Sequence, residues 1–304
     1  MVEPPLRRPR PGRRTLAFRR GVAFGVLIVA FLAVAWLAAA AVRTVSDDPP
    51  PPPPTTRAAA QPLQILRIVF PEGFTRAEMA RRITRVNALA KGRRKVTPKL
   101  SEQAYLKLTQ SHVLPGQFAR DRKKRPLEGF LFPATYEFTK KTTTRQLVDD
   151  QLEAFRKAWA KVDLGYARSK KLTAYDVLII ASMVEKETIA PDERPLVAAV
   201  IYNRLKARMP LGIDATIRYG LGVPGTEPLR QSQLQSDNPY NTRKFLGLPP
   251  TPIANPGLAS IQAAAHPARK DFLYFVRKPD RVHHFFTASE AEFFRKACEY
   301  GYGC

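Results

Sequence analysis

The sequence predicts an α+β protein with a single N-terminal transmembrane helix, a small α+β subdomain and a larger mixed α/β domain. Three observations lead to this. Residues 21–42 form an uncharged apolar run, and residues 65–70 form a short β-prone run followed by a helix-capping pattern. Residues 177–184 then begin a series of apolar helices separated by loops rich in proline, asparagine and glycine. The length of 304 residues suits about two folded domains of ordinary size.

Composition excludes several classes of protein. The chain has two cysteines and four histidines, which is too few for a disulfide scaffold or a multi-cysteine zinc module. It contains no His-Glu-x-x-His motif, so a metalloprotease would lack its ligands. We therefore expect neither a metal nor a cofactor. Lysine and arginine number 50 against 26 acidic residues, giving a net charge of +24.

The apolar run at 21–42 has the length of a membrane span. It contains 22 residues without a charge, and crossing the hydrocarbon core takes about 20 apolar residues. A signal peptide has a shorter apolar region of about 7–15 residues that ends in small residues. Ala38 to Ala41 resemble such a cleavage site, but the length of the run and the deep position of Trp36 favour an uncleaved anchor.

The flanking charges predict the orientation of this anchor. Residues 1–20 carry one acid, Glu3, and seven arginines: Arg7, Arg8, Arg10, Arg13, Arg14, Arg19 and Arg20. Basic flanks stay in the cytoplasm, so we expect a cytoplasmic tail and a body outside the membrane. A basic chain often binds nucleic acid, but an exported body meets none. An anionic polymer or the membrane surface is the expected partner, and a merely solvated basic surface is the alternative.

A proline-rich linker, residues 43–62, follows the anchor. It contains six consecutive prolines at 49–54, which favour an extended, semi-rigid spacer. Residues 63–126 then form the small subdomain: the β-prone run, a turn, a helix capped by Thr75 and Glu78, and a second helix from about residue 101. This order resembles a LysM glycan-binding module, and a generic small α+β domain fits the same residues.

Residues 127–304 form the larger domain. An aromatic segment at 127–136 joins it to the subdomain, and the pattern at 144–160 predicts an amphipathic helix. Thr173 and Asp176 predict the start of a helix that is apolar on all sides and ends near Glu185 and Glu187. Residues two apart lie about 200° apart around a helix, so the two glutamates are not a paired site, and periodicity does not choose between them.

An acid at the end of a buried helix has a clear chemical use. Apolar surroundings raise the pKa of a carboxyl group, which lets a glutamate stay protonated near neutral pH and act as a general acid. Solvated helix-end glutamates paired with Lys186 and Arg194 are the alternative. A second apolar helix is expected at 194–208. Four irregular motifs around it predict loops suited to sugar binding, at 214–220, 238–242, 247–257 and 263–267.

Together these motifs resemble one family. Leu-Glu-Gly-Phe-Leu-Phe-Pro at 127–133, Glu-Lys-Glu-Thr at 185–188, Gly-Leu-Pro-Pro at 247–250 and His266-Pro267 occur in order. They look like the MltG/YceG family of endolytic murein transglycosylases, and the resemblance covers about residues 63–290. It implies a LysM-like subdomain before a catalytic domain, outside the inner membrane. It also implies association with peptidoglycan synthases and the elongation or division machinery.

The resemblance also implies an activity and its residues. The enzyme would cleave the MurNAc–GlcNAc bond of nascent glycan strands, leave 1,6-anhydroMurNAc ends and so terminate glycan elongation. Related enzymes carry a glutamate before a small hydroxyl residue, which makes Glu187 the catalytic acid and Glu185 the fallback. The substrate-binding residues would be Glu128, Asn203, Asp214, Thr216, Tyr219, Tyr240, Asn241 and Thr242. A membrane-anchored peptidoglycan-binding scaffold without catalysis is the rival hypothesis.

Overall fold

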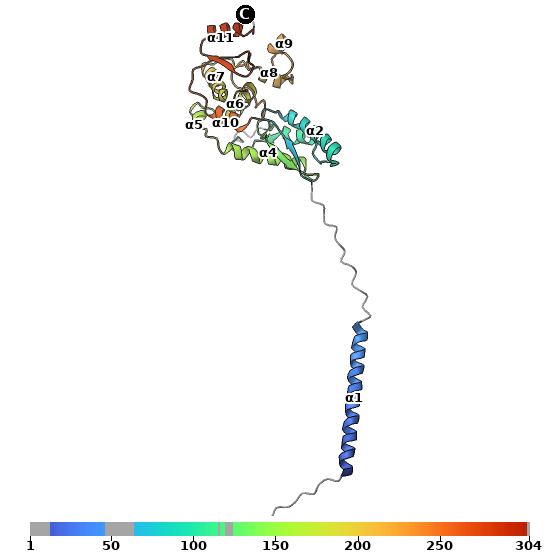
Figure 1. Ribbon diagram of the computed structural model, residues 1–304. Coiled ribbons are helices and arrows are strands. Elements are labelled where there is room, and N and C mark those ends of the chain that lie inside the picture. Colours follow the sequence, from blue (N-terminus) through green and yellow to red (C-terminus); the bar gives the residue numbers. More distant parts are fainter. Residues whose placement is uncertain (1–12, 46–63, 115, 119–123, 303–304) are drawn as a thin grey trace, which may run out of the picture. The chain divides into compact units, whose positions relative to one another are not determined.

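The structure is a computed structural model that describes residues 13–45, 64–114, 116–118 and 124–302 (Figure 1). The chain divides into two compact units, residues 1–61 and residues 62–304. Residues 1–12 of the expected basic tail and residues 46–62 of the expected linker lie outside the described residues.

The first unit contains one long helix, α1 (Arg13–Val45). Its side chains are described from residue 25 to residue 41, and the large apolar ones among them are exposed, including Trp36 at 73%. No helix within the described part of the chain combines the length and the apolarity that a membrane crossing requires.

The second unit mixes short strands with many helices. In chain order its elements are β1 (Leu66–Val69), α2 (Arg76–Arg94), α3 (Glu102–Gln110), β2 (His112–Val113), η1 (Gly116–Phe118), β3 (Lys124–Arg125), β4 (Thr135–Phe138), α4 (Thr144–Trp159), α5 (Gly165–Ser169), α6 (Ala174–Glu187), η2 (Pro191–Glu193), α7 (Arg194–Ala207), α8 (Asp214–Leu221), α9 (Gln231–Leu234), α10 (Leu258–Ala265), β5 (Tyr274–Arg277), β6 (His284–Thr287) and α11 (Glu290–Glu299). The α+β class expected from the sequence is confirmed.

The described strands form three antiparallel pairs, β1 with β4, β2 with β3 and β5 with β6. In the first pair Leu66 faces Phe138 and Val69 faces Thr135. The strands β1 and β4 therefore come from either side of the expected domain boundary at residue 126. Between them in sequence lie α2 and α3, followed by β2, η1 and β3.

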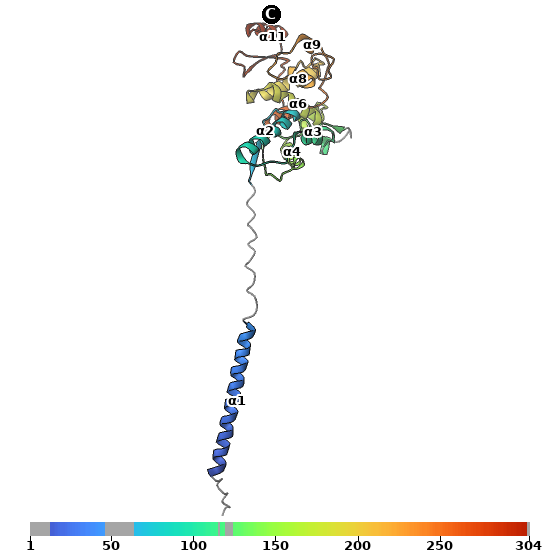
Figure 2. The ribbon, with the colours of Figure 1, turned by 90° about the vertical axis from the view of Figure 1, so that its right-hand side faces the viewer.

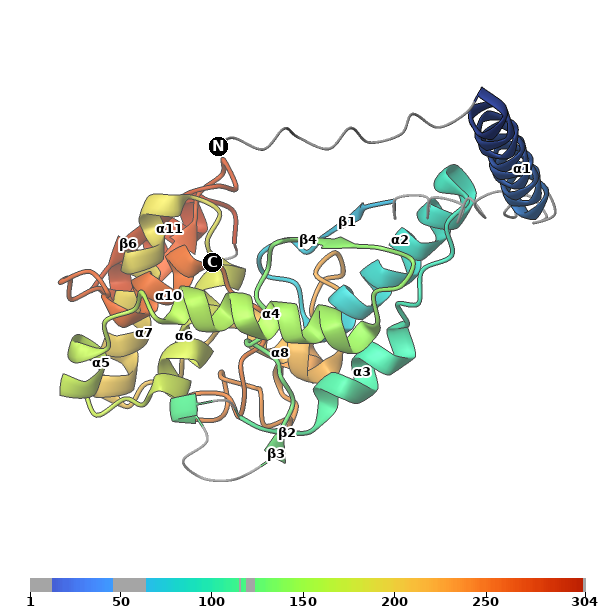
Figure 3. The ribbon, with the colours of Figure 1, turned by 90° about the horizontal axis from the view of Figure 1, so that it is seen from below.

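Helix α6 is central to the core of the second unit. Every residue from Val177 to Val184 is buried, as expected for a helix that is apolar on all sides. It packs against α7 and α10, and Figure 3 shows α4 crossing in front of this region. The expected capping boxes are both present, Thr75 with Glu78 at the start of α2 and Thr173 with Asp176 at the start of α6.

Two of the expected loops are helical. Residues 214–220 lie in α8, which has an acid in its first turn and ends at left-handed Gly222. Residues 263–265 complete α10, because a run of alanines favours the helix until Pro267 approaches. The polar and proline residues of these motifs predict loops, whereas the intervening residues are adequate helix formers.

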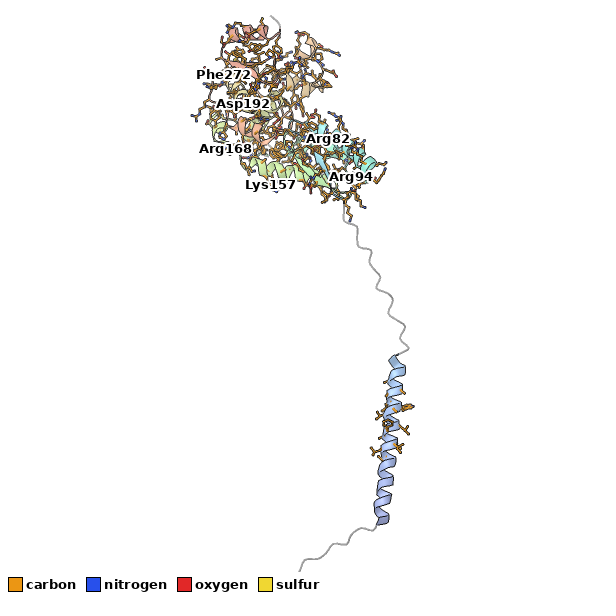
Figure 4. The ribbon with its side chains drawn as sticks, viewed as in Figure 1. Arg82, Arg94, Lys157, Arg168, Asp192 and Phe272 are labelled. Carbon is orange, nitrogen blue, oxygen red and sulfur yellow. The ribbon has the colours of Figure 1, made fainter. Side chains whose placement is uncertain are left out.

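The N-terminal and C-terminal parts of the second unit lie at different ends. Figures 1 and 2 both place α4 at one end of it and α11 at the other. Figure 4 shows Arg82 and Arg94 at the α2 edge, while Asp192 of η2 and Phe272 lie toward the α11 end. Helix α6 is thus positioned to join the two ends, and its last turn carries the glutamates.

Candidate active site

The site is built on the C-terminal end of α6. Thr188 leaves the helix with an extended backbone (φ −104°, ψ 132°), and its hydroxyl donates to the Val184 carbonyl at 2.6 Å. Pro191 follows shortly afterwards and disfavours the helical conformation at Ala190. The chain must therefore turn away here, which leaves Glu187 as the last helical residue.

The two glutamates of this turn have different surroundings. Glu185 accepts the backbone N–H of Gly257 at 3.0 Å. Gly257 is the N-cap of α10 and has no side-chain cap of its own, so the Glu185 carboxylate fills that role at the positive end of the helix. No hydrogen bond to the Glu187 carboxyl group is found within the described ranges, so Glu187 is the glutamate whose carboxyl group is not used by the fold.

Burial and four charged neighbours determine the acidity of Glu187. The side chain is half-buried, and burial raises its pKa from 4.5 to about 7. The guanidinium of Arg277 has the largest effect among the charged neighbours and lowers the pKa of Glu187. The negative charge of Asp214 raises this pKa, and the smaller effects of Lys186 and Arg218 lower it. A carboxyl group with a pKa near neutrality is partly protonated at physiological pH and can both give and accept a proton.

Glu128 is a second carboxyl group with a raised pKa, and it is fully engaged. It is 2% exposed, and burial raises its pKa to about 7 against the hydrogen bonds that favour its charge. Those bonds come from the backbone N–H of Arg76 at 2.9 and 3.1 Å, from Asn255 Nδ2 at 2.8 Å and from the Tyr219 hydroxyl at 3.2 Å. Glu128 therefore links the start of α2 to α8 and to the loop before α10.

Asn255 stands at the centre of this link. Its Oδ1 accepts the backbone N–H groups of Gly129 and Leu131 at 2.9 and 3.0 Å, and its Nδ2 donates to the Phe74 carbonyl at 2.9 Å and to Glu128. The side chain is completely buried. The sequence places Asn255 only within the loop at 247–257 that is expected to suit sugar binding, because its four partners lie far away along the chain.

Tyr219 and Tyr240 are brought together. Their rings lie 5.1 Å apart between centroids, tilted by 59°. The Tyr219 hydroxyl is held by Glu128 and the Tyr240 hydroxyl pairs with that of Thr251 at 2.7 Å. Two fixed aromatic rings beside α8 are suited to packing against the faces of sugar rings.

The other expected binding residues make mostly internal hydrogen bonds. The hydroxyls of Thr216 and Thr242 pair at 2.9 Å, and Thr242 also accepts the Ile213 N–H at 3.0 Å. The Asn241 amide donates to two backbone carbonyls, as does that of Asn203 at 2.8 and 2.9 Å. These four side chains fix the loops around α8 and after α10.

Asp214 lies at the first turn of α8 and is half-exposed. Arg243 Nε donates to Asp214 Oδ1 at 2.7 Å, and the negative charge of Asp214 raises the pKa of Glu187.

Two surface hollows, of about 470 and 460 Å³, are lined in part by His266 and by Pro267 respectively, and neither is lined by Glu187. In the described part of the chain, no cluster of three or more His, Cys, Asp or Glu side chains could hold a metal ion.

The model of the YceG-like family matches residues 52–299. That range includes all of the elements from β1 to α11. The chain belongs to the YceG-like family. Within this family's range lie the Glu187 turn, the Glu128–Asn255 link and the two tyrosines.

Similar proteins agree with this membership. The endolytic murein transglycosylase of Bacillus subtilis is 39% identical over 155 residues, which are 51% of this chain and 43% of that protein. The endolytic murein transglycosylase of Streptococcus pneumoniae R6 is 34% identical over 226 residues, 69% of this chain and 40% of that protein. The crystal structure of a YceG-like protein from Listeria monocytogenes is 30% identical with a TM-score of 0.58, covering 76% of this chain and 75% of that one. The chain spans about two fifths of the length of the curated relatives.

The raised pKa of Glu187 predicts how its replacement changes stability with pH. Between about pH 4.5 and 7 the folded protein binds more protons at this group than the unfolded chain does, so its contribution to stability falls as pH rises through that window. Glu187→Gln removes this titrating carboxyl group. We expect the variant to gain about 1–3 kcal/mol relative to the wild type between pH 5 and pH 8. Urea unfolding of both proteins at the two pH values measures this, and an equal difference at both would contradict it.

Proposed function

We propose that the protein is a lytic transglycosylase that cleaves the MurNAc–GlcNAc bond of nascent peptidoglycan glycan strands and thereby terminates their elongation. The observation that carries this is the free carboxyl group of Glu187, with its pKa near 7, at the end of a rigid buried helix. Membership of the YceG-like family and similarity to proteins named endolytic murein transglycosylases support the substrate. Glu185 is tied to Gly257, which favours Glu187 as the catalytic residue.

Glu187 acts twice in the proposed reaction. As an acid it gives its proton to the glycosidic oxygen, the bond from that oxygen to C1 of MurNAc breaks, and positive charge develops at C1. As a carboxylate it then takes the proton of the C6 hydroxyl of the same sugar. The C6 oxygen bonds to C1 and closes a 1,6-anhydro ring, so no water is consumed and Glu187 is again protonated.

The surrounding residues bind the strand in this proposal. Tyr219 and Tyr240 offer aromatic faces to the sugar rings, and Asp214, beside Glu187, accepts from a sugar hydroxyl. Glu128 holds the Tyr219 hydroxyl in place. Asn203, Thr216, Asn241 and Thr242 shape the loops through the internal hydrogen bonds described above.

We propose further that residues 21–42 anchor the chain in the inner membrane, with the tail in the cytoplasm and the body outside. The exposed apolar side chains of α1 and the arginines of the tail support this. The segment 63–126 would serve as a LysM-like glycan-binding subdomain, which the order β1, α2, α3 supports. Peptidoglycan synthases and the elongation or division machinery are the proposed partners.

The products of the reaction test the proposal. The purified full-length chain is incubated with uncrosslinked glycan strands, and the products are separated and weighed by mass spectrometry. Strands ending in 1,6-anhydroMurNAc, 18 mass units lighter than hydrolysis products because no water is added, are expected. Reducing MurNAc ends would mean hydrolysis and would overturn the mechanism. Uncleaved strands that sediment with the protein would favour the non-catalytic scaffold instead.

A further inference from the structure

Four polar residues form a line that ends at the catalytic turn. Glu193 of η2, His284 of β6 and Arg277 of β5 lead to Glu187 at the end of α6. His284 Nδ1 lies 2.6 Å from Glu193 Oε2, Arg277 Nε lies 3.5 Å from His284 Nε2, and Arg277 Nη2 lies 3.3 Å from the Glu187 carbonyl oxygen. His284 and Glu193 are 4% and 5% exposed, so this end of the line is part of the interior, whereas Arg277 and Glu187 are partly exposed.

The donors along the line fix the tautomer of His284. A guanidinium only donates, so the Arg277 Nε–H must meet a lone pair on His284 Nε2. The proton of the neutral ring is then on Nδ1, where it is donated to Glu193 Oε2. The other oxygen of Glu193 accepts the backbone N–H of His284 at 2.8 Å. Both carboxylate oxygens of Glu193 are thus used to hold one imidazole ring in one orientation.

Aromatic packing holds the same ring from two sides. Phe275 of β5 meets His284 edge-on with centroids 5.3 Å apart, and Phe286 of β6 meets it at 6.0 Å. Arg277 and His284 are direct partners across the β5–β6 pair and contact each other through their side chains, so the position of the imidazole limits where the guanidinium can lie. A displaced ring would therefore displace Arg277.

Arg277 acts on Glu187 in two ways. It donates to the carbonyl at the C-terminal end of α6, where a positive charge is favourable. It is also the cation with the largest influence on the Glu187 carboxyl group. The other charged groups that act on this carboxyl are Lys186 on α6 and Asp214 and Arg218 on α8.

We propose that Glu193 and His284 are positioning residues that hold Arg277 beside Glu187, and that Arg277 stabilises the carboxylate formed when Glu187 gives up its proton. This rests on the proposed function. Three residues from outside α6 thus support the reaction, and the transient negative charge on Glu187 has Arg277 as its partner. The two glutamates have different roles: Glu193 orients the imidazole, and Glu187 changes protonation.

Glu193→Gln tests the positioning without opening a cavity. The single amide oxygen is needed by the His284 backbone N–H, so the amide NH₂ faces Nδ1 and moves the ring proton to Nε2, opposite the Arg277 Nε–H. The contact with Arg277 is then lost. Arg277→Met removes the charge directly, Arg277→Lys restores charge without the planar fork, and exposed Arg295→Met on α11 is the matched control.

The pH–rate profile is the main measurement. A general acid works while protonated, so activity falls as pH rises through its pKa. Without the nearby cation the pKa of Glu187 is higher. The descending limb of the pH–rate profile therefore moves to higher pH by about 0.5–1 pH unit in Arg277→Met and Glu193→Gln. We expect kcat at pH 7 to fall about tenfold in both, with Arg277→Lys between them and the wild type. Arg295→Met should match the wild type.

A second readout separates this inference from the proposed function. Carbon-13 NMR follows the titration of the Glu187 carboxyl group, whose signal is assigned by its disappearance in Glu187→Gln and needs no turnover. An upward shift of this titration in Arg277→Met and Glu193→Gln supports the inference. An unchanged titration and an unchanged pH–rate profile overturn it, even if the wild type produces anhydro ends. Absence of anhydro ends from the wild type, with the titration shifted, overturns only the proposed function.

Discussion

Glu187→Gln is expected to lower the rate of strand cleavage by about 10²–10⁴-fold, because an amide can neither give nor take the proton at the glycosidic bond. The replacement keeps the size of the side chain, so the fold and strand binding should persist. The measurement is the initial rate of anhydro-end formation by the full-length chain at pH 7. Circular dichroism and sedimentation with glycan strands show whether fold and binding are retained.

The matched control lies two residues away. Glu185→Gln keeps an oxygen that can accept the Gly257 N–H, so we expect activity within about tenfold of the wild type and a loss of roughly 0.5–1 kcal/mol in stability from the weaker helix-end charge. An inactive Glu185→Gln together with a fully active Glu187→Gln would reverse the assignment of the catalytic residue.

Asn255→Ala is expected to destabilise the body by about 3–5 kcal/mol. It leaves the N–H groups of Gly129 and Leu131 without their buried acceptor. It also removes one of the donors to the Phe74 carbonyl and one of the donors to the Glu128 carboxyl group. Each unsatisfied buried group costs about 1–3 kcal/mol, partly relieved by water entering the space. Urea unfolding at pH 7 measures the change.

Asn203→Ala provides the comparison for this variant. Its amide also bridges two chain segments, through the carbonyls of Lys270 and Phe272. It is less buried, so water can replace it, and we expect a loss of about 1–2 kcal/mol. Equal losses in the two variants would refute the special role of Asn255. Asn255→Asp should also destabilise, more at pH 8 than at pH 5, because it places a second carboxyl group beside Glu128.

Sequence patterns predicted those parts of the fold that depend on neighbouring residues. The capping boxes at Thr75 and Thr173 and the buried run of α6 were predicted because their partners are within four residues. The pairing of β1 with β4 could not be read in the same way. Each strand has only four residues, and the register is set by contacts across about seventy positions.

The candidate site divides along the same line. The pattern identified a helix-end acid but left Glu185 and Glu187 open, since the angle between them does not say which neighbours they meet. Glu187 is favoured because the Glu185 carboxylate accepts the N–H of Gly257, which lies 72 positions away in the sequence. No sequence pattern singles out Arg277, His284 and Glu193 as functional. Their side chains come into contact only when η2, β5 and β6 pack together.

The hydrogen bonds between Asn255 and Phe74 join residues 181 positions apart. During synthesis at 5–20 residues per second, the loop before α10 is made about 10–40 seconds after the turn that it must hold. The start of α2 thus gains its buried partners late, and pairings of such separation form slowly. We expect early-emerging segments of the body to be open to proteases and chaperones over that interval.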